Sequence, residues 1–244
     1  HGNRRTRCST ESASRITAMT DDIIRLEDIE KTYAMGRVTI PVLRDITFSV
    51  TQGEHVSIMG PSGSGKTTLL NILGCLDHPT AGRYLMEGRD ISTFSDDQLS
   101  EVRSRKIGFI FQSYNLIPQL TVIENIGIPL FYQGIEDRII HERSVEKAKL
   151  VGLEHRLTHR PTELSGGQQQ RVAIARALIN DPLMILADEP TGNLDSATGK
   201  EIMQLLKSLN ETGKTIVLIT HDQAIAAFGS RTIHILDGRI VHAS

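Results

Sequence analysis

Two hydrophobic periods divide the chain, one typical of strands and one typical of helices. Ile46, Phe48 and Val50 alternate with threonine and serine, so residues 23–50 are predicted to be β structure that includes a half-buried strand. Short apolar runs bounded by polar residues or glycine predict further strands at residues 56–59, 106–112, 183–187 and 215–220.

Segments with helical spacing alternate with these strands. Ser95 and Gln98 form a capping-box pattern that begins one of them, and Gly213 is a stop signal for another. Asp237-Gly238 predicts the turn of a closing hairpin. Alternation of strands and helices predicts an α/β fold with a largely parallel sheet. The expected helices are 67–76, 95–105, about 143–151, 165–180 and 196–212.

Composition narrows the class of protein. The 244 residues are 39% hydrophobic, enough for one large domain or two unequal lobes. A net charge of -2 gives no argument for nucleic-acid binding, so no nucleic-acid partner is expected. Cys8 and Cys75 are too few for a disulfide framework. No apolar run approaches the roughly 20 residues that span a bilayer, so any membrane role requires a partner.

The first 18 residues differ from the rest of the chain. They are rich in arginine, serine and threonine, and Glu11 is their one acidic residue. This composition weakly resembles an organelle transit peptide, but an upstream leader or an appended tail is the preferred explanation. We therefore expect a disordered segment at 1–18 and a domain at 19–244, with a helical lobe at about 113–180.

A glycine-rich segment fits the pattern G-x-x-x-x-G-K-[ST] and lies between a predicted strand and a predicted helix. In this setting the backbone N–H groups cradle nucleotide phosphates, and the helix N-terminus adds positive potential. Lys66 is expected to pair with the β- and γ-phosphates, and Thr67 to bind Mg²⁺. A plain surface turn would not explain why Lys-Thr-Thr opens a helix. The segment consists of Gly60, Pro61, Ser62, Gly63, Ser64, Gly65, Lys66, Thr67 and Thr68.

Two adjacent acids end the apolar run at 183–187. Asp188 and Glu189 repel each other and must remain solvated or find a cation. Mg²⁺ at Asp188 would resolve this conflict. Glu189 would then act on the water that attacks the γ-phosphorus. The alternative is a solvated strand end.

A second motif, Leu164-Ser165-Gly166-Gly167-Gln168, resembles the signature of the ATP-binding-cassette (ABC) proteins. The resemblance covers roughly residues 23–242. It implies a P-loop NTPase fold with a RecA-like, mostly parallel sheet, an antiparallel β subdomain and a helical signature lobe. It also implies an ATPase that uses ATP and Mg²⁺ and is coupled to transport.

The same resemblance assigns further residues one by one. Tyr33 matches the aromatic that stacks on adenine, although alone it would be a core or edge residue. Gln112 matches the glutamine that reaches Mg²⁺ and the attacking water. Asp195, in the segment Asn193-Leu194-Asp195, matches the loop that crosses a dimer interface. His221 matches the histidine that contacts the γ-phosphate; alone it would be an ordinary strand-end histidine.

The resemblance also implies a homodimer in the ATP-bound state. Ser165, Gly166, Gly167 and Gln168 begin a predicted helix and could bind an anion, yet the chain already carries one complete phosphate cradle. In the ABC family the signature of one subunit closes over ATP held by the other.

Local sequence resembles one group within the family, the MacB, LolD and FtsE-like ATPases. The similar segments are 71–82, 112–118, 120–125 and 191–195. This group implies an integral membrane permease as partner, contacted through its cytoplasmic coupling helix, and a peripheral location at the cytoplasmic face of the inner membrane. It implies lipoprotein release, or macrolide or peptide export.

The competing class is an ABC ATPase without a transport role, in cell division, DNA repair or translation. Repair-type members insert long coiled coils between the two motifs, whereas here Lys66 and Ser165 are 99 residues apart without sustained heptads. Translation-type members normally carry two cassettes, and this chain has one set of motifs.

The segment 113–130 combines many apolar residues with Pro118 and Pro129, which we expect to act as breakers. We expect this apolar stretch to be uncovered and to receive a helix of the membrane partner. The alternative is that it packs the helical lobe.

Overall fold

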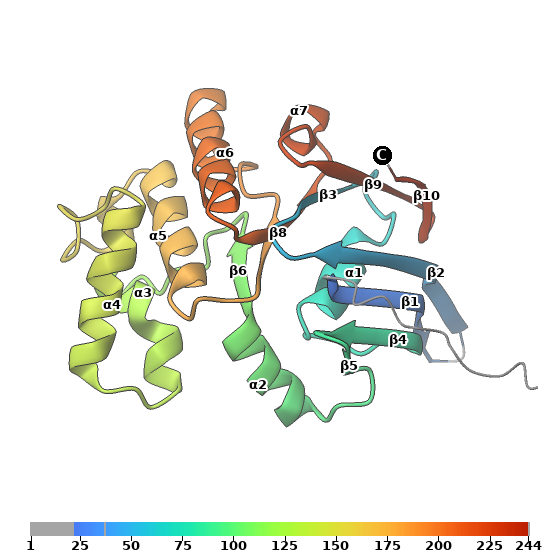
Figure 1. Cartoon of the computed structure of the whole chain (residues 1–244). Helices are drawn as coiled ribbons and strands as arrows, with labels where there is room; N and C mark the ends of the chain where they lie inside the picture. Colours follow the sequence, from blue (N-terminus) through green and yellow to red (C-terminus); the bar gives the residue numbers. More distant parts are fainter. Residues whose placement is uncertain (1–21, 37, 244) are drawn as a thin grey trace, which may run out of the picture.

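The structure is a computed structural model that describes residues 22–36 and 38–243. The predicted leader at 1–18 lies outside these residues. The chain forms two sheets with helices around them (Figure 1). The described part of the chain contains no helix that is both long enough and apolar enough to cross a membrane.

The larger sheet has six strands in the order β10-β9-β3-β8-β7-β6. Its five strands from β9 to β6 run parallel, and β10 closes the edge as an antiparallel hairpin with β9. The phosphate loop follows β3, and the acidic pair lies at the end of β7. Both strands are neighbours of β8 in the sheet. The strands are β3 (His55–Met59), β6 (Ile107–Phe111), β7 (Met184–Asp188), β8 (Thr215–Thr220), β9 (Arg231–Leu236) and β10 (Arg239–Ala243).

The central strands have two buried faces, because successive side chains point to opposite sides of a sheet. Met184 and Leu186 of β7 face one hydrophobic core, with α1 (Lys66–Leu73) and the antiparallel sheet. Ile185 and Ala187 face the other core, with α5 (Gly166–Leu178) and α6 (Ser196–Glu211). The helix that follows the phosphate loop and the helix that begins at the signature thus cover opposite faces of one sheet.

The smaller sheet is antiparallel, with strand order β2-β1-β4-β5. Its long strands leave the body of the molecule as a ribbon, on the side where α1 packs (Figure 1). The strands are β1 (Asp22–Met35), β2 (Val38–Thr51), β4 (Ala81–Met86) and β5 (Arg89–Asp90). The predicted fold class, with its mostly parallel core and antiparallel subdomain, is confirmed.

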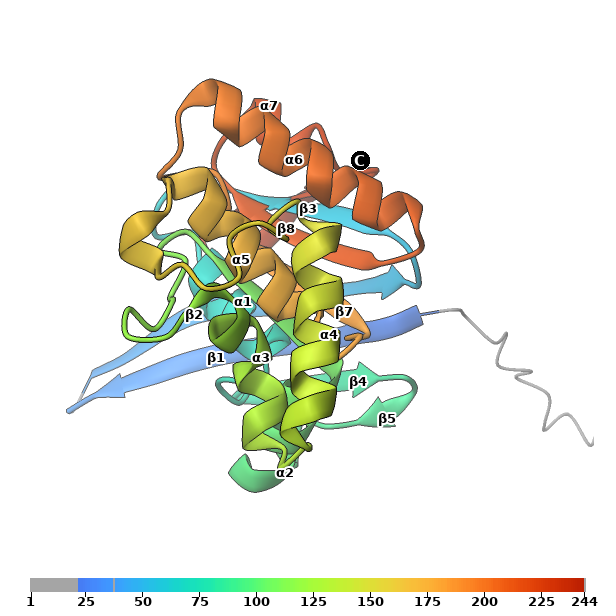
Figure 2. The ribbon, with the colours of Figure 1, turned by 90° about the vertical axis from the view of Figure 1, so that its left-hand side faces the viewer.

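A group of helices forms the other end of the molecule. Figure 2 shows α3 (Val122–Tyr132) and α4 (Asp137–Leu150) side by side at the front, with α5 behind them. Both pack on the core that also contains α6. The remaining elements are α2 (Asp96–Lys106), η1 (Pro161–Glu163) and α7 (Gln223–Ala226).

Two expectations about this group were wrong. Pro129 does not break the segment but lies inside α3, where burial of Val122, Ile126 and Leu130 on one helix face outweighs the lost backbone hydrogen bond. α4 begins at Asp137, six residues before the expected start at 143.

Helix boundaries elsewhere follow the local signals closely. The capping box at Ser95 is confirmed, with Ser95 Oγ accepting from Gln98 N and the Gln98 side chain accepting from Ser95 N. α1 ends at Leu73, earlier than expected. Gly74 is its C-cap residue. Glycine is required at this position because a Cβ would lie 2.4 Å from the Phe109 ring.

Candidate functional site

The glycine-rich segment forms a tight loop between β3 and α1. Gly65 caps α1 with φ 102°, a left-handed conformation that favours glycine. A Cβ at Gly60 would lie 2.2 Å from the Ile235 carbonyl oxygen, so the loop also requires glycine where it passes β9. Lys66 Nζ donates to the carbonyls of Gly60 (2.7 Å) and Pro61 (2.8 Å). The lysine charge is therefore held within the loop.

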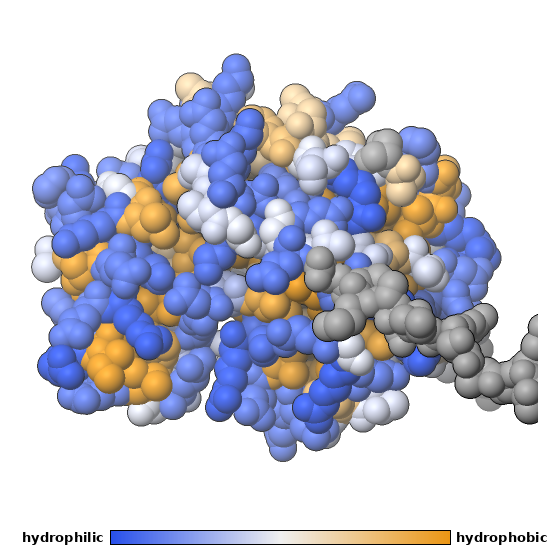
Figure 3. Space-filling view, in the orientation of Figure 1, coloured by the Kyte–Doolittle hydropathy of each residue, from blue (hydrophilic) through white to orange (hydrophobic). Residues whose placement is uncertain are grey.

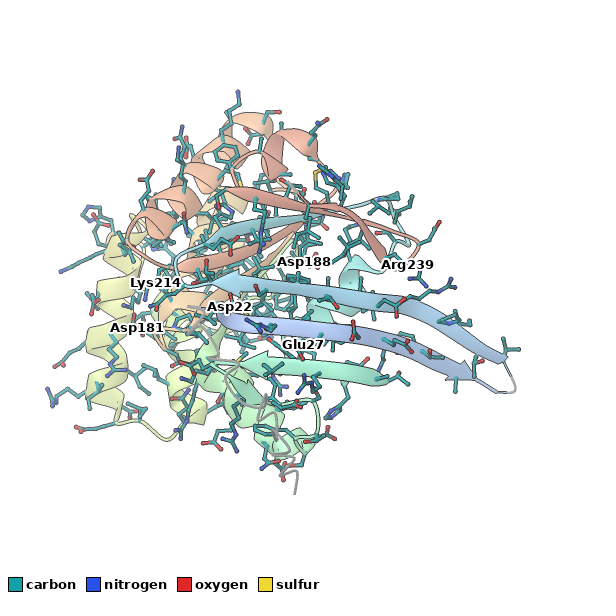
Figure 4. The ribbon with its side chains drawn as sticks, turned by 45° about the vertical axis from the view of Figure 1, so that its right-hand side comes forward. Asp22, Glu27, Asp181, Asp188, Lys214 and Arg239 are labelled. Atoms are coloured by element: carbon teal, nitrogen blue, oxygen red, sulfur yellow. The ribbon has the colours of Figure 1, made fainter. Side chains whose placement is uncertain are left out.

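The acidic pair lies beside this lysine. Burial raises the pKa of Asp188, the adjacent Glu189 raises it further, and Lys66 opposes both effects. Figure 4 places Asp188 in the interior of the molecule, between the strands of the two sheets. A half-buried carboxyl group next to a second carboxyl group favours a cation, which would stabilise the ionised form.

Glu189 is held by Thr220, the last residue of β8, and by His221, which follows it. Its Oε1 accepts from His221 N (2.9 Å) and lies 2.6 Å from His221 Nδ1, while Oε2 accepts from Thr220 Oγ1 (3.1 Å). Glu189 itself has φ 45°, the left-handed region, which directs its side chain toward His221. The structure thus brings Glu189 and His221 together.

Gln112 follows β6 and is bonded to the segment after β7. Gln112 Nε2 donates to Asn193 Oδ1 (3.2 Å), and Asn193 Nδ2 donates to the Gln112 carbonyl (3.0 Å). Asp195, two residues further on, caps α6 and accepts from Ala197 N, Thr198 N and Thr198 Oγ1. These hydrogen bonds, first that from the Thr198 side chain, lower the pKa of Asp195. Asp195 therefore has a structural role in its own subunit.

The signature begins α5 with a second capping box. Ser165 Oγ accepts from Gln168 N (3.3 Å), and Gln168 Oε1 accepts from Ser165 N (3.0 Å). Ser165 is exposed, whereas Gly167 is buried and could not carry a Cβ, which would lie 2.4 Å from Thr198 Cγ2. Because α5 and α1 cover opposite faces of the sheet, the structure does not bring the signature to the phosphate loop of the same chain.

Tyr33 lies on β1 and reaches the segment around α1. Its hydroxyl donates to Asp77 Oδ2 (2.9 Å), and Thr68 of α1 is a second hydrogen-bonding neighbour. Burial, followed by the bond to Asp77, raises the pKa of Tyr33. The ring is 37% exposed, so it is available to a ligand beside the phosphate loop.

The residues expected to hold Mg²⁺ fit a hard cation. Thr67 supplies a hydroxyl, Gln112 an amide oxygen and Asp188 a half-buried carboxylate, all of which are oxygen ligands of the type Mg²⁺ prefers. Among the described residues no group of three or more His, Cys, Asp or Glu side chains could hold a metal. Mg²⁺ commonly binds through one or two carboxylates plus substrate phosphates, so such a group is not required.

Three contributors to the site were missed in the sequence. Asn193 bonds to Gln112, and Thr220 bonds to Glu189. Arg176 of α5 donates to the carbonyls of Tyr114 (2.7 Å) and Asn115 (2.5 Å), two residues with positive φ just after Gln112. A signal was available only for Asn193, which lies within the recognised loop motif.

Comparison with known proteins places these features in a family. The sequence profile described as ABC transporter matches residues 43–192. An ABC transporter ATP-binding protein of Thermotoga maritima is 55% identical over 218 residues, covering 89% of this chain and 93% of that protein. The macrolide export ATP-binding/permease protein MacB of Syntrophobacter fumaroxidans is 51% identical over 90% of this chain. The match spans only 31% of MacB.

A solved structure agrees with the fold. The dimeric post-hydrolysis state of the ATP-binding cassette MJ0796, a protein of Methanocaldococcus jannaschii, is bound to ADP and Pi. It superimposes with a TM-score of 0.82 at 49% identity, covering 91% of this chain and 97% of that one.

Proposed function

The chain belongs to the ABC transporter family and is an ATP-binding ATPase, and on this basis we propose that it acts as one half of a cassette dimer that drives a membrane permease. In this proposal two chains enclose two ATP molecules. Each ATP lies between the phosphate loop of one chain and the signature of the other.

One observation carries the dimer proposal. The signature presents an exposed helix N-terminus, yet it lies on the opposite face of the sheet from the α1 helix of its own chain. Free N–H groups at such a terminus favour an anion. A second chain can supply that anion as bound ATP. The dimeric cassette MJ0796, bound to ADP and Pi, supports the same arrangement.

In the proposed reaction Lys66 and the loop N–H groups hold the β- and γ-phosphates, and the Tyr33 ring stacks on the base. When bound at Thr67, Gln112 and Asp188, Mg²⁺ would neutralise phosphate charge. Glu189 orients water and accepts its proton as the water oxygen attacks the γ-phosphorus and the bond to ADP breaks. His221 holds Glu189 in place and would contact the γ-phosphate from the same strand end.

Size-exclusion chromatography with ATP tests the dimer. Glu189→Gln keeps the cradle but lacks the proton acceptor, so it is expected to accumulate as an ATP-bound dimer. Lys66→Ala is expected to remain a monomer, because the cradle loses its positive charge. A monomeric Glu189→Gln protein that still binds ATP would contradict the dimer proposal without affecting the ATPase assignment.

The permease is proposed to dock between α3 and α4. An apolar hollow of about 430 Å³ lies there, lined by Leu120, Ile123, Ile128, Phe131 and Ile140, with Glu124 and Asp137 also in its wall. Figure 3 shows apolar surface over these two helices, with hydrophilic surface around it. An apolar helix with basic residues would complement this hollow in shape and charge.

The expected docking stretch 113–130 is thus divided between two environments. Ile126 is fully buried in the helical core and Leu116 packs against that core, whereas Leu120 and Ile123 line the hollow. The alternative that the segment packs the helical lobe therefore holds for its buried residues. The partially exposed residues remain candidates for a partner.

MacB relatives carry a permease in the same chain by name, and their ATP-binding part is similar to this protein. This supports an export role, with macrolides, peptides or released lipoproteins as cargo chosen by the permease. The chain would then sit at the cytoplasmic face of the inner membrane, held there by its partner.

Leu120→Glu tests the docking surface. It is expected to leave ATP hydrolysis by the isolated chain intact and to abolish co-purification with the permease from mild-detergent extracts. Leu150→Glu is the matched control, because Leu150 is an exposed leucine of α4 outside the hollow. Equal co-purification of both variants would place the docking surface elsewhere.

A further inference from the structure

Asp77 lies just beyond α1 and binds two side chains of β1 at once. Its Oδ2 accepts from the Tyr33 hydroxyl (2.9 Å), and its Oδ1 accepts from Lys31 Nζ (2.6 Å). Oδ1 also accepts from the backbone N–H of His78 (2.8 Å), which fixes the orientation of the carboxylate. Burial alone would raise the pKa of Asp77, but the hydrogen bonds from Lys31, Tyr33 and His78 lower it overall.

Lys31 completes this arrangement, because it bonds to the same carboxylate and lies over the Tyr33 ring. It is only 8% exposed, and its Nζ lies 4.9 Å from the centroid of the Tyr33 ring while it donates to Asp77 and to the His78 carbonyl (2.7 Å). A cation at this distance covers one ring face favourably. The opposite ring face is therefore the one left for a ligand.

The segment that carries Asp77 is itself attached to β1. Thr80 N donates to the Glu30 carbonyl (2.7 Å), and Thr32 N donates to Thr80 Oγ1 (3.0 Å). Asp77 and Tyr33 are thereby held at a constant separation although they are 44 residues apart in sequence. Without these bonds the Tyr33 side chain would keep its rotamer freedom until a ligand bound, and binding would then carry the entropic cost of ordering it.

We propose that Asp77 and Lys31 position the Tyr33 ring for the nucleotide base, and that this three-residue clamp sets the affinity for the base. The inference rests on the proposed stacking of Tyr33 on ATP. Asp77 and Lys31 act through Tyr33 and are positioning residues. A ring already oriented before binding has less conformational entropy to lose, so its contribution to affinity is larger.

Tyr33→Phe is the decisive variant, because it removes the hydroxyl that bonds to Asp77 and keeps the ring. Stacking of a base on an aromatic ring contributes about 5- to 150-fold in affinity. Loss of positioning alone is expected to raise KM for ATP by about 3- to 10-fold, with kcat unchanged. Affinity for inorganic triphosphate, which has no base, is expected to stay the same, and the affinities for ATP and GTP are expected to fall together, because stacking tolerates any base.

Asp77→Asn and the double variant with Tyr33→Phe complete the test. Both substitutions act on the same hydrogen bond: Tyr33→Phe removes its donor, and Asp77→Asn removes the charge of its acceptor. Their effects on KM are therefore expected to be less than additive. Tyr132→Phe is the matched control, since Tyr132 is an 80% exposed tyrosine of α3. Thermal unfolding of each variant identifies any general loss of stability.

Several results would overturn the clamp. One is an unchanged or lower KM in Tyr33→Phe, and another is an equal loss of ATP, GTP and triphosphate affinity in Asp77→Asn. The Tyr33→Ala variant tests the proposed stacking of the ring on ATP independently of the clamp. If removal of the whole ring leaves ATP affinity unchanged while Lys66→Ala abolishes it, the stacking role is wrong but the phosphate cradle stands.

Discussion

The phosphate loop leads into the N-terminus of α1 and the signature forms the N-terminus of α5, but the surroundings of the two helix starts differ. The helix after the phosphate loop begins at Lys66, and the charge of Lys66 lowers the pKa of Asp188. The next residue, Glu189, is bonded to His221. At the signature, the side chains of Ser165 and Gln168 accept hydrogen bonds from each other's backbone N–H groups. The first region is a nearly complete reaction centre. The second would be half of a site in the proposed dimer, completed by ATP that another chain holds.

The largest expected effect falls on the first region. Glu189→Gln removes the proton acceptor and keeps the three hydrogen-bonding neighbours nearby, so turnover is expected to fall by about 10²- to 10⁴-fold. Single-turnover hydrolysis of radiolabelled ATP measures this step. Full hydrolysis by Glu189→Gln would remove Glu189 from the proposed role.

Ser165→Arg tests the second region and is expected to reduce turnover by about 100-fold while leaving monomer affinity for ATP intact. The arginine puts bulk and charge where the partner's γ-phosphate would lie. Measurement combines ATPase rates with size-exclusion chromatography in ATP.

A matched control for this substitution exists in the same chain. Ser95 caps α2 through the same type of capping box, so Ser95→Arg has a similar cost in helix capping but lies outside the signature. If Ser95→Arg and Ser165→Arg lose activity equally, helix destabilisation explains the result. If Ser165→Arg hydrolyses ATP normally, the two-chain site is wrong.

His221→Ala is expected to lower kcat by about 10-fold, the equivalent of one charge-assisted hydrogen bond. Because the proposed contact is to the γ-phosphate, ADP affinity is expected to change little. Isothermal titration with ADP and with a non-hydrolysable ATP analogue checks this difference. His155→Ala, at an exposed position of the helical region, is the control. An equal loss of ADP and ATP affinity would indicate a folding role.

The prediction that concerns ATP turnover least is a pH dependence of stability at the start of β3, away from the reaction centre. His55 is 2% exposed, and burial lowers its pKa to about 4. Between pH 6.5 and 4 the unfolded chain binds more protons at this position than the folded chain, so stability is complete above pH 6.5 and is lost as the pH falls toward 4. The expected contribution is about 3 kcal/mol.

Denaturant unfolding at pH 7 and pH 4.5 measures this contribution. His55→Gln is expected to be less dependent on pH than the wild type, whereas His155→Gln at an exposed site is expected to behave like the wild type. Identical pH dependence of all three proteins would show that His55 does not cause it.

Much of the fold and half of the site could be predicted, because their determinants are local. The capping boxes at Ser95 and Ser165 depend on residues three apart, and the phosphate loop depends on a short run of glycines beside Lys66. The same local signal, Thr121 with Glu124, marks the start of α3, yet Pro129 concealed that helix. Its stability comes from packing against other helices, which a local rule for proline does not include.

The sequence by itself determined most of the strands and helices of the parallel-sheet core, the phosphate cradle, the acidic pair and the signature, because short-range periodicity and turn chemistry specify them. Only the tertiary structure decided that Glu189 meets His221, that Gln112 meets Asn193 and that Tyr33 meets Asp77. These pairs are 32, 81 and 44 residues apart in the chain. Their contacts depend on which strands become neighbours in the sheet, and burial of the two hydrophobic cores sets that order for the chain as a whole.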